Sequence, residues 1–139
     1  MRTLYFVLVL SVSLLQSAQA EDPVFFADAN LKAAVENELW VSDPTPTDML
    51  NLTSLYCTQN WGTQTVITSL TGLEYALNLR TLHIRLNEID DISPLAGLVS
   101  LETVDLSQNQ ISDLSPLSSL AACSVCAAGG SHSHNGVTD

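Results

Sequence analysis

The sequence has few basic residues and no familiar catalytic signature. Its 139 residues hold four Lys and Arg against fifteen Asp and Glu, a balance that repels nucleic acid and anionic membranes and favours basic partners or cations. A solvated acidic surface without a particular partner fits the same balance. No Gly-rich phosphate loop or HExxH sequence is present, and His83, His132 and His134 lack a nearby Ser or Cys nucleophile in a recognisable arrangement. We therefore expect neither an enzyme nor a nucleic-acid-binding protein.

Long apolar runs are also missing, apart from one at the N-terminus. Arg2 precedes an apolar run from Leu4 to Leu15, and Ala18-Gln19-Ala20 follows it. This order predicts a secretory signal peptide over residues 1–20, because the run is shorter than the ~20 residues that a bilayer-spanning helix needs. Cleavage would leave a chain with three basic and fifteen acidic side chains, a formal balance of −12. We expect export to the periplasm, the cell surface or the medium, without membrane insertion after cleavage.

The segment from Leu79 to Leu120 repeats itself with a period of 22, the step in numbering from Leu79 to Leu101. The other matching positions are Leu82 and Val104, Ile84 and Leu106, Asn87 and Asn109, Ile89 and Ile111, and Leu95 and Leu117. Units of this kind bury their apolar faces by stacking on their neighbours. Alternate residues of each short strand point inward, so the intervening ones face solvent. The candidate binding residues on that outer face are Thr81, His83, Arg85, Thr103, Asp105 and Ser107.

An earlier coil becomes visible once an insertion is allowed. The step in numbering is 27 from Leu52 to Leu79 and from Leu55 to Leu82, and Cys57 and Asn60 precede their counterparts by the same step. From Ile67 to Ile89, however, the step is only 22. Five extra residues are therefore expected between Asn60 and Ile67, in a bulge whose Trp61 is either exposed or folded back. An inward asparagine can satisfy the backbone groups of a turning chain, and the structural asparagines predicted here are Asn60, Asn87 and Asn109.

Helical segments are expected before the coils and between the strands. Residues 21–51 read as a helical cap, in which Asp28 or Asn30 begins the first helix and Trp40 closes its apolar stripe. That stripe consists of Leu31, Ala34, Val35 and Leu39. Thr45, Pro46 and Asp48 stand at the N-cap, first and third positions of a second helix. Within the coils, Ser93-Pro94 and Ser115-Pro116 predict an N-cap serine and a first-position proline for a tight helical turn.

The repeat pattern LxxLxLxxNxIxDISPLxxL resembles the 22-residue leucine-rich repeat of bacterial internalins, and ADANLKAAVENEL resembles their helical cap. The resemblance covers residues 24–120. It implies an α/β fold, a short right-handed solenoid with parallel strands on the concave face, 3₁₀ turns on the convex face and a helical N-terminal cap. Members of this family mostly bind proteins, so we expect an exported interaction module that binds a protein or peptide on its concave face, without a cofactor.

The repeat spans residues 52–120 and weakens over residues 121–139, which we interpret as a degenerate last coil followed by a disordered tail. Continuing the period from Leu101 and Val104 leads to Cys123 and Cys126, so these cysteines fit core positions. Together with His132 and His134 they could instead bind a metal, although one Cys-x-x-Cys pair is a weak signature. Cys57 is expected to be a buried free thiol. The abrupt end also suits a truncated or frame-shifted repeat fragment of a larger exported protein or enzyme, without activity of its own.

Overall fold

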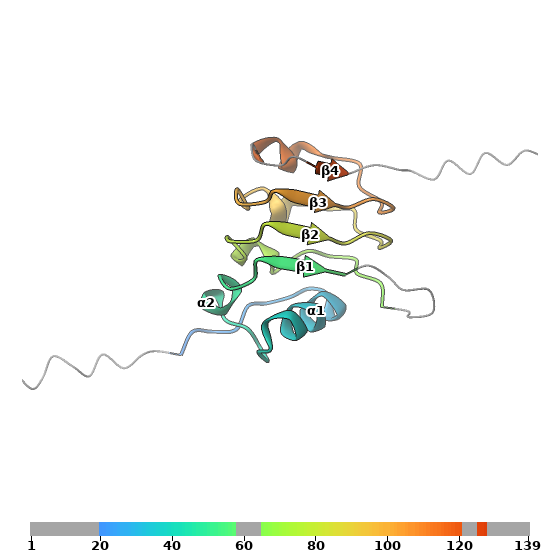
Figure 1. Cartoon of the computed structure of the whole chain (residues 1–139). Helices are drawn as coiled ribbons and strands as arrows, with labels where there is room; N and C mark the ends of the chain where they lie inside the picture. The colour runs from blue at the N-terminus through green and yellow to red at the C-terminus, as the bar shows by residue number, and fades with distance from the viewer. Residues whose placement is uncertain (1–19, 58–64, 121–124, 128–139) are drawn as a thin grey trace, which may run out of the picture.

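The computed structural model of the chain describes residues 20–57, 65–120 and 125–127. Helices α1 (Ala29–Leu39) and α2 (Pro46–Met49) lie at one end of a stack of coils (Figure 1). Each coil contributes one three-residue strand, and the strands are β1 (Ser54–Tyr56), β2 (Thr81–His83), β3 (Thr103–Asp105) and β4 (Val125–Ala127). Between them lie the 3₁₀ helices η1 (Leu73–Tyr75), η2 (Ser93–Leu95) and η3 (Ser115–Ser119).

The strands form one parallel sheet in the order β1-β2-β3-β4. Ser54 pairs with Thr81, a step of 27 in the numbering, whereas Thr81 pairs with Thr103 and Thr103 with Val125, both steps of 22. These pairings confirm both the period and the shift of five residues in the first coil. Asn60, Trp61 and most of the expected bulge lie at residues 58–64, which are outside the described residues.

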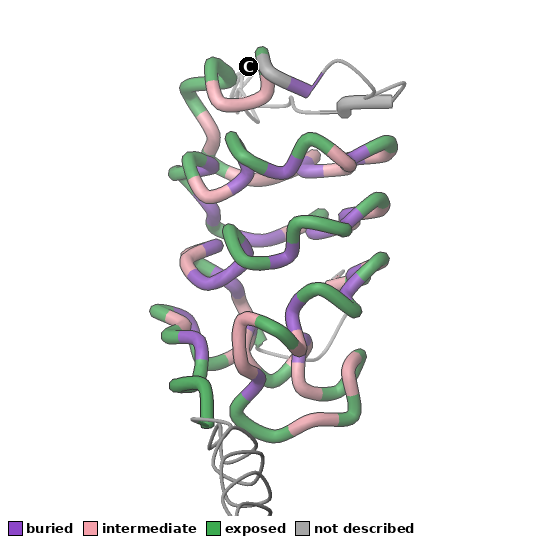
Figure 2. Tube along the Cα trace, turned by 90° about the vertical axis from the view of Figure 1, so that its left-hand side faces the viewer, coloured by how far each residue is buried: buried purple, intermediate pink, exposed green. Residues whose placement is uncertain are grey.

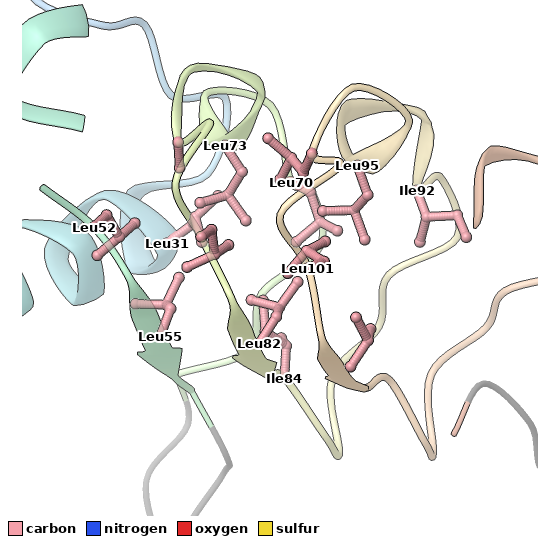
Figure 3. Packing of buried hydrophobic residues seen from close by; sticks show 14 of the residues in the cluster. Leu31, Leu52, Leu55, Leu70, Leu73, Leu82, Ile84, Ile92, Leu95 and Leu101 are labelled. Atoms are coloured by element: carbon pink, nitrogen blue, oxygen red, sulfur yellow. The ribbon is translucent and has the colours of Figure 1, made fainter. Parts of the chain in front are cut away.

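One core of buried hydrophobic side chains runs through the stack, and buried positions recur in successive coils (Figure 2). Leu82 and Ile84 point inward from β2 and its continuation and are fully buried, as are Leu52 and Leu101 at the starts of their coils (Figure 3). Burial of each such side chain contributes about 1.5–3 kcal/mol. Towards the C-terminal end the packing thins, because Ile89 and Leu95 are fully buried while their counterparts Ile111 and Leu117 are only partly buried.

The helical cap is fastened to the first coil through Asp28. Its carboxylate caps α1 by accepting hydrogen bonds from the backbone N–H groups of Asn30 and Leu31, at 2.8 and 3.0 Å. The other oxygen accepts from the backbone N–H and the hydroxyl of Thr68, at 2.8 and 3.0 Å. Leu31 and Val35 form the buried side of α1, and α2 begins at Thr45 with the predicted capping box to Asp48.

Trp40 does not close the apolar stripe of α1, so that prediction was wrong. The residue has a left-handed backbone, with φ of 56°, at the position where α1 ends. This conformation turns the side chain away from the core and leaves it 93% exposed. Helical spacing predicted that Trp40 continues the apolar stripe. Because α1 ends at Leu39, that spacing does not apply to Trp40.

The serines of the Ser-Pro pairs do not act as N-caps either. Ser93 is already the first residue of η2, and its backbone N–H donates to the carboxylate of Asp91 at 2.8 Å. Its hydroxyl also donates to Asp91, at 2.9 Å. Asp113 and Ser115 repeat this arrangement in the next coil at the same two distances. The aspartate two residues before each serine therefore provides the hydrogen-bond acceptor at the start of the 3₁₀ helix. Its carboxylate accepts from both the backbone N–H and the hydroxyl of the serine.

Candidate interaction surface

The predicted binding residues lie on the solvent-facing side of the sheet, opposite the core. Pairing between neighbouring strands arranges them in rows. Thr81 lies opposite Thr103, and His83 lies opposite Asp105. All four side chains are partly exposed, with one buried residue between the two outward positions of each strand. Arg85 continues the β2 side of this surface and is exposed, and Ser107 continues the β3 side and is partly exposed. We call the outward residues of β1–β3 and their continuations the concave face.

Tyr56 belongs to the same surface and was not predicted as a binding residue. It is the register partner of His83, and the two rings stack with their centroids 5.1 Å apart and their planes within 12°. Tyr56 nevertheless remains 62% exposed. Tyr56 precedes His83 by the same step that separates Leu55 from Leu82, so the shift that aligned the first coil also contained the signal for this contact. The concave face therefore carries a row of Tyr56, His83 and Asp105.

Charges of both signs meet at the end of this row. Hydrogen bonding from Ser107 lowers the pKa of Asp105 below its usual value, and electrostatic interactions with His83 and Arg85 act in the same direction. Asp105 is therefore ionised at neutral pH. Arg85 donates from Nε to the side-chain oxygen of Gln108 at 2.7 Å, which directs its guanidinium towards the neighbouring coil. A cation and an anion thus stand beside an aromatic stack in an otherwise acidic protein.

Two of the predicted structural asparagines support the chain just behind this surface. Asn87 is buried, and its side-chain oxygen accepts from the backbone N–H of Ile67 at 2.9 Å. Its nitrogen donates to the carbonyl oxygens of Cys57 and Arg85, at 3.0 and 3.2 Å. Asn109 is bonded in the same manner to Ile89, Ile84 and Leu106, at 3.1, 2.8 and 2.9 Å. The predicted row of asparagines is confirmed for these two coils, and Asn60 lies outside the described residues.

A second row of exposed residues follows the period of the coils. Leu50, Leu77 and Val99 are separated by the same steps in numbering as the paired strands, and they are 40%, 50% and 64% exposed. Each lies two residues before a fully buried leucine of the core, which places the row at the edge where the chain enters the strands. Their apolar side chains gave no sign in the sequence that these positions are exposed.

Two of the three cysteines lie in the described residues, at the register positions that the period predicts. Cys57 is free and only partly buried, so the expectation of a buried thiol was too strong; burial, together with the charge of Glu38, raises its pKa to about 11. Cys126 lies in β4 opposite Val104, as the period predicts. Cys123, His132 and His134 lie outside the described residues. Within the part of the chain that the structure describes, no three His, Cys, Asp or Glu side chains are grouped to hold a metal.

Known proteins share this architecture. Residues 77–119 match the family model described as leucine-rich repeats in two copies. Internalin C2 from Listeria monocytogenes is similar with 28% identity and a TM-score of 0.52, over 73% of this chain and 54% of that one. Internalin InlF from the same organism shares the fold at 24% identity and a TM-score of 0.50, over 75% of this chain and 38% of that one. No curated protein matches the sequence.

A third similar structure holds the CBM51-2 and INT domains of ZmpB from Clostridium perfringens. It has 35% identity and a TM-score of 0.52, over 61% of this chain and 17% of that one. The chain thus spans between about a sixth and about half of these solved chains. No helix among the described residues is long and apolar enough to cross a membrane. Residues 20–57, 65–120 and 125–127 therefore adopt an internalin-like leucine-rich-repeat fold, closed at its N-terminal end by a helical cap.

Proposed function

We propose that the chain is an exported interaction module that binds a protein or peptide on its concave face. Export rests on the charge, length and small-residue ending of residues 1–20. Binding on the concave face rests on the row of Tyr56, His83 and Asp105, and the stack of Tyr56 on His83 is the observation that carries the proposal. An aromatic ring that is held in place yet remains largely exposed suits an interface, because it provides contact area at little cost in side-chain entropy.

The charges beside this stack favour a partner with charges of both signs. Asp105 can accept from a cationic side chain, while Arg85 offers a guanidinium to a carboxylate. Charged residues at the edge of an interface chiefly set the association rate and the choice of partner, whereas a central aromatic side chain carries most of the affinity. We therefore infer that Tyr56 is the anchor of the binding surface and that Arg85 and Asp105 select the partner.

A display-library selection tests this proposal without a known partner. Binders selected on the wild-type protein are measured again on Tyr56→Ala, Arg85→Glu and Asp105→Lys. Tyr56→Ala is expected to weaken the dissociation constant about tenfold or more, since central aromatic contacts commonly contribute about 2 kcal/mol or more. Glu88→Lys reverses an exposed charge on the loop that leaves the sheet and serves as the matched control. Binders that tolerate all three concave variants and lose affinity only with the control would refute the proposal.

A further inference from the structure

An exposed tryptophan stands where α1 ends, away from the row of Tyr56 and His83. The side chain of Trp40 is 93% exposed, and its backbone N–H donates to the carbonyl oxygen of Glu36 to close the helix. Its φ of 56° is uncommon for a bulky residue and needs support from the surrounding chain. Core packing does not account for the indole at this place.

The segment that follows Trp40 is fastened to α1 by several contacts. The backbone N–H of Asp43 donates to the carboxylate of Glu36 at 2.8 Å, and that of Val41 donates to the carbonyl oxygen of Glu36 at 3.3 Å. Lys32 pairs with the carboxylate of Asp43 and lies 3.6 Å from that of Glu36. The indole is therefore presented on a segment whose position is set before any partner arrives.

An open pocket of about 460 Å³ lies beside the indole. Its lining residues are Glu36, Asn37, Trp40, Val41 and Ser42. Among these described lining residues, Glu36 carries the one charged side chain. The pocket thus combines an aromatic ring, a carboxylate and uncharged polar groups, which is the composition of a site that orients a ligand.

The electrostatics of this corner favour a cation. The C-terminal end of a helix carries a partial negative charge, and the last turn of α1 contains no basic residue to offset it. Glu36 and Glu38 add two carboxylates to this end of the helix. Lys32, the cation among these contacts, is already engaged by Asp43 and Glu36. A positive charge over the indole would gain from the ring, from the carboxylates and from the helix end together.

We propose that this pocket binds an Arg or Lys side chain of a basic protein segment. The cationic head would lie against the face of Trp40 and near the carboxylate of Glu36, while Asn37 and Ser42 supply hydrogen-bonding groups at its edge. The strongly acidic balance of the chain would steer such a segment towards the protein. This site is formed by residues other than those of the concave face, so it can operate whether or not that face binds a partner.

A peptide titration tests the proposal. The probe is a Gly-spaced peptide with four arginines, and the matched probe carries citrulline, a neutral side chain of the same shape, in their place. The protein carries Trp61→Phe, so that Trp40 is the only fluorescent indole. We expect the arginine peptide to change the Trp40 emission in a saturable manner and the citrulline peptide to leave it unchanged.

Variants measured by calorimetry locate the site. Trp40→Leu is expected to weaken binding of the arginine peptide about threefold to tenfold. Glu36→Gln keeps an acceptor for the N–H of Asp43 but removes the charge, and it should weaken binding to a similar extent. Phe25→Leu alters another exposed aromatic side chain, 74% exposed, and should bind as the wild type does. Equal affinity for both peptides, or unchanged affinity in Trp40→Leu, would overturn the proposal.

Discussion

The side-chain nitrogen of Asn87 donates to the backbone carbonyl oxygen of Cys57, 3.0 Å away in the preceding coil. The oxygen of the same amide accepts from the backbone N–H of Ile67. One side chain thus joins the two arms of the first coil on either side of its insertion. Because Asn87 is only 6% exposed, water cannot readily replace these bonds if the amide is removed.

Asn87→Ala is expected to lower the free energy of unfolding more than Asn109→Ala. Each buried backbone group that loses its partner costs about 1–3 kcal/mol. Asn109 makes the same kinds of bonds, but it lies nearer the C-terminal end of the stack and is only partly buried, so water can compensate for part of its loss. Urea unfolding of both variants measures the difference. Equal losses would show that burial of the asparagine does not determine its contribution.

Acid should weaken the attachment of the helical cap. Burial opposes ionisation of Asp28, but hydrogen bonds from Thr68, Leu31 and Asn30 outweigh it and hold the pKa below its usual value. The stability that the ionised carboxylate contributes is therefore present above the unfolded-state pKa, about 3.9, and is lost as the pH falls through the lower folded-state pKa.

Asp28→Asn tests this expectation. The variant should be less stable than the wild type at neutral pH, because an amide can accept on one side only and presents N–H groups towards the donors of Thr68. Its free energy of unfolding should also change less between pH 5 and pH 2. Urea unfolding at a series of pH values gives both quantities. A variant whose stability follows the wild-type pH dependence would rule out Asp28 as a contributor.

Gly72→Ala should destabilise the protein by about 1–3 kcal/mol. Gly72 has φ of +106°, and a Cβ atom there would lie 2.5 Å from Cδ1 of Phe26 and 3.0 Å from the carbonyl oxygen of Phe25. Gly97→Ala is the matched control, because nothing lies within 4 Å of the Cβ position. Thermal unfolding should show a lower Tm for the first variant and an unchanged or slightly higher Tm for the second. A neutral Gly72→Ala would contradict the close contact with Phe26.

Cys57 should react slowly with alkylating reagents. Since the thiolate is the reactive form, a pKa of about 11 leaves about a thousandth of the thiol reactive at pH 8. A free cysteine with a pKa of about 8.5 would be roughly a quarter ionised there. In a Cys123→Ser, Cys126→Ser background, iodoacetamide should modify Cys57 roughly two hundredfold more slowly than a free thiol, and the rate should rise with pH. Modification at the rate of a free thiol would show that Cys57 is not protected.

Regularly repeated features of this fold could be predicted from the sequence. Leu82 and Ile84 mark an inward strand, and the spacing of Asn87 and Asn109 marks the inward amides, because stacked coils require the same residue type at the same place. The capping box at Thr45 depends on residues only three positions apart, so it could also be predicted from the local sequence. The insertion changes the spacing only in the first coil, and the register of β1 with β2 confirms the predicted shift of five residues.

Features that depend on one backbone angle or on one neighbouring coil could not be predicted in the same way. Trp40 continues the apolar spacing of α1, and only its left-handed backbone shows that it leaves the core. Serine is a common N-cap residue, but Ser93 is instead the first residue of η2, and its backbone N–H donates to the carboxylate of Asp91. On the concave face, the stack of Tyr56 on His83 follows from strand register, and the alternation within a single strand does not reveal it.

Amide chemical-shift mapping tests most directly whether the concave face is the binding surface. A binder selected on the wild-type protein is titrated into the isotope-labelled full chain, and the shifted amides are compared with their positions in the coils. We expect the largest changes at Tyr56, His83 and Asp105 and their neighbours in β1, β2 and β3, with small changes in η1 and η2. Changes concentrated in the 3₁₀ helices, with the amides of the Tyr56 row unaltered, would contradict binding on the concave face.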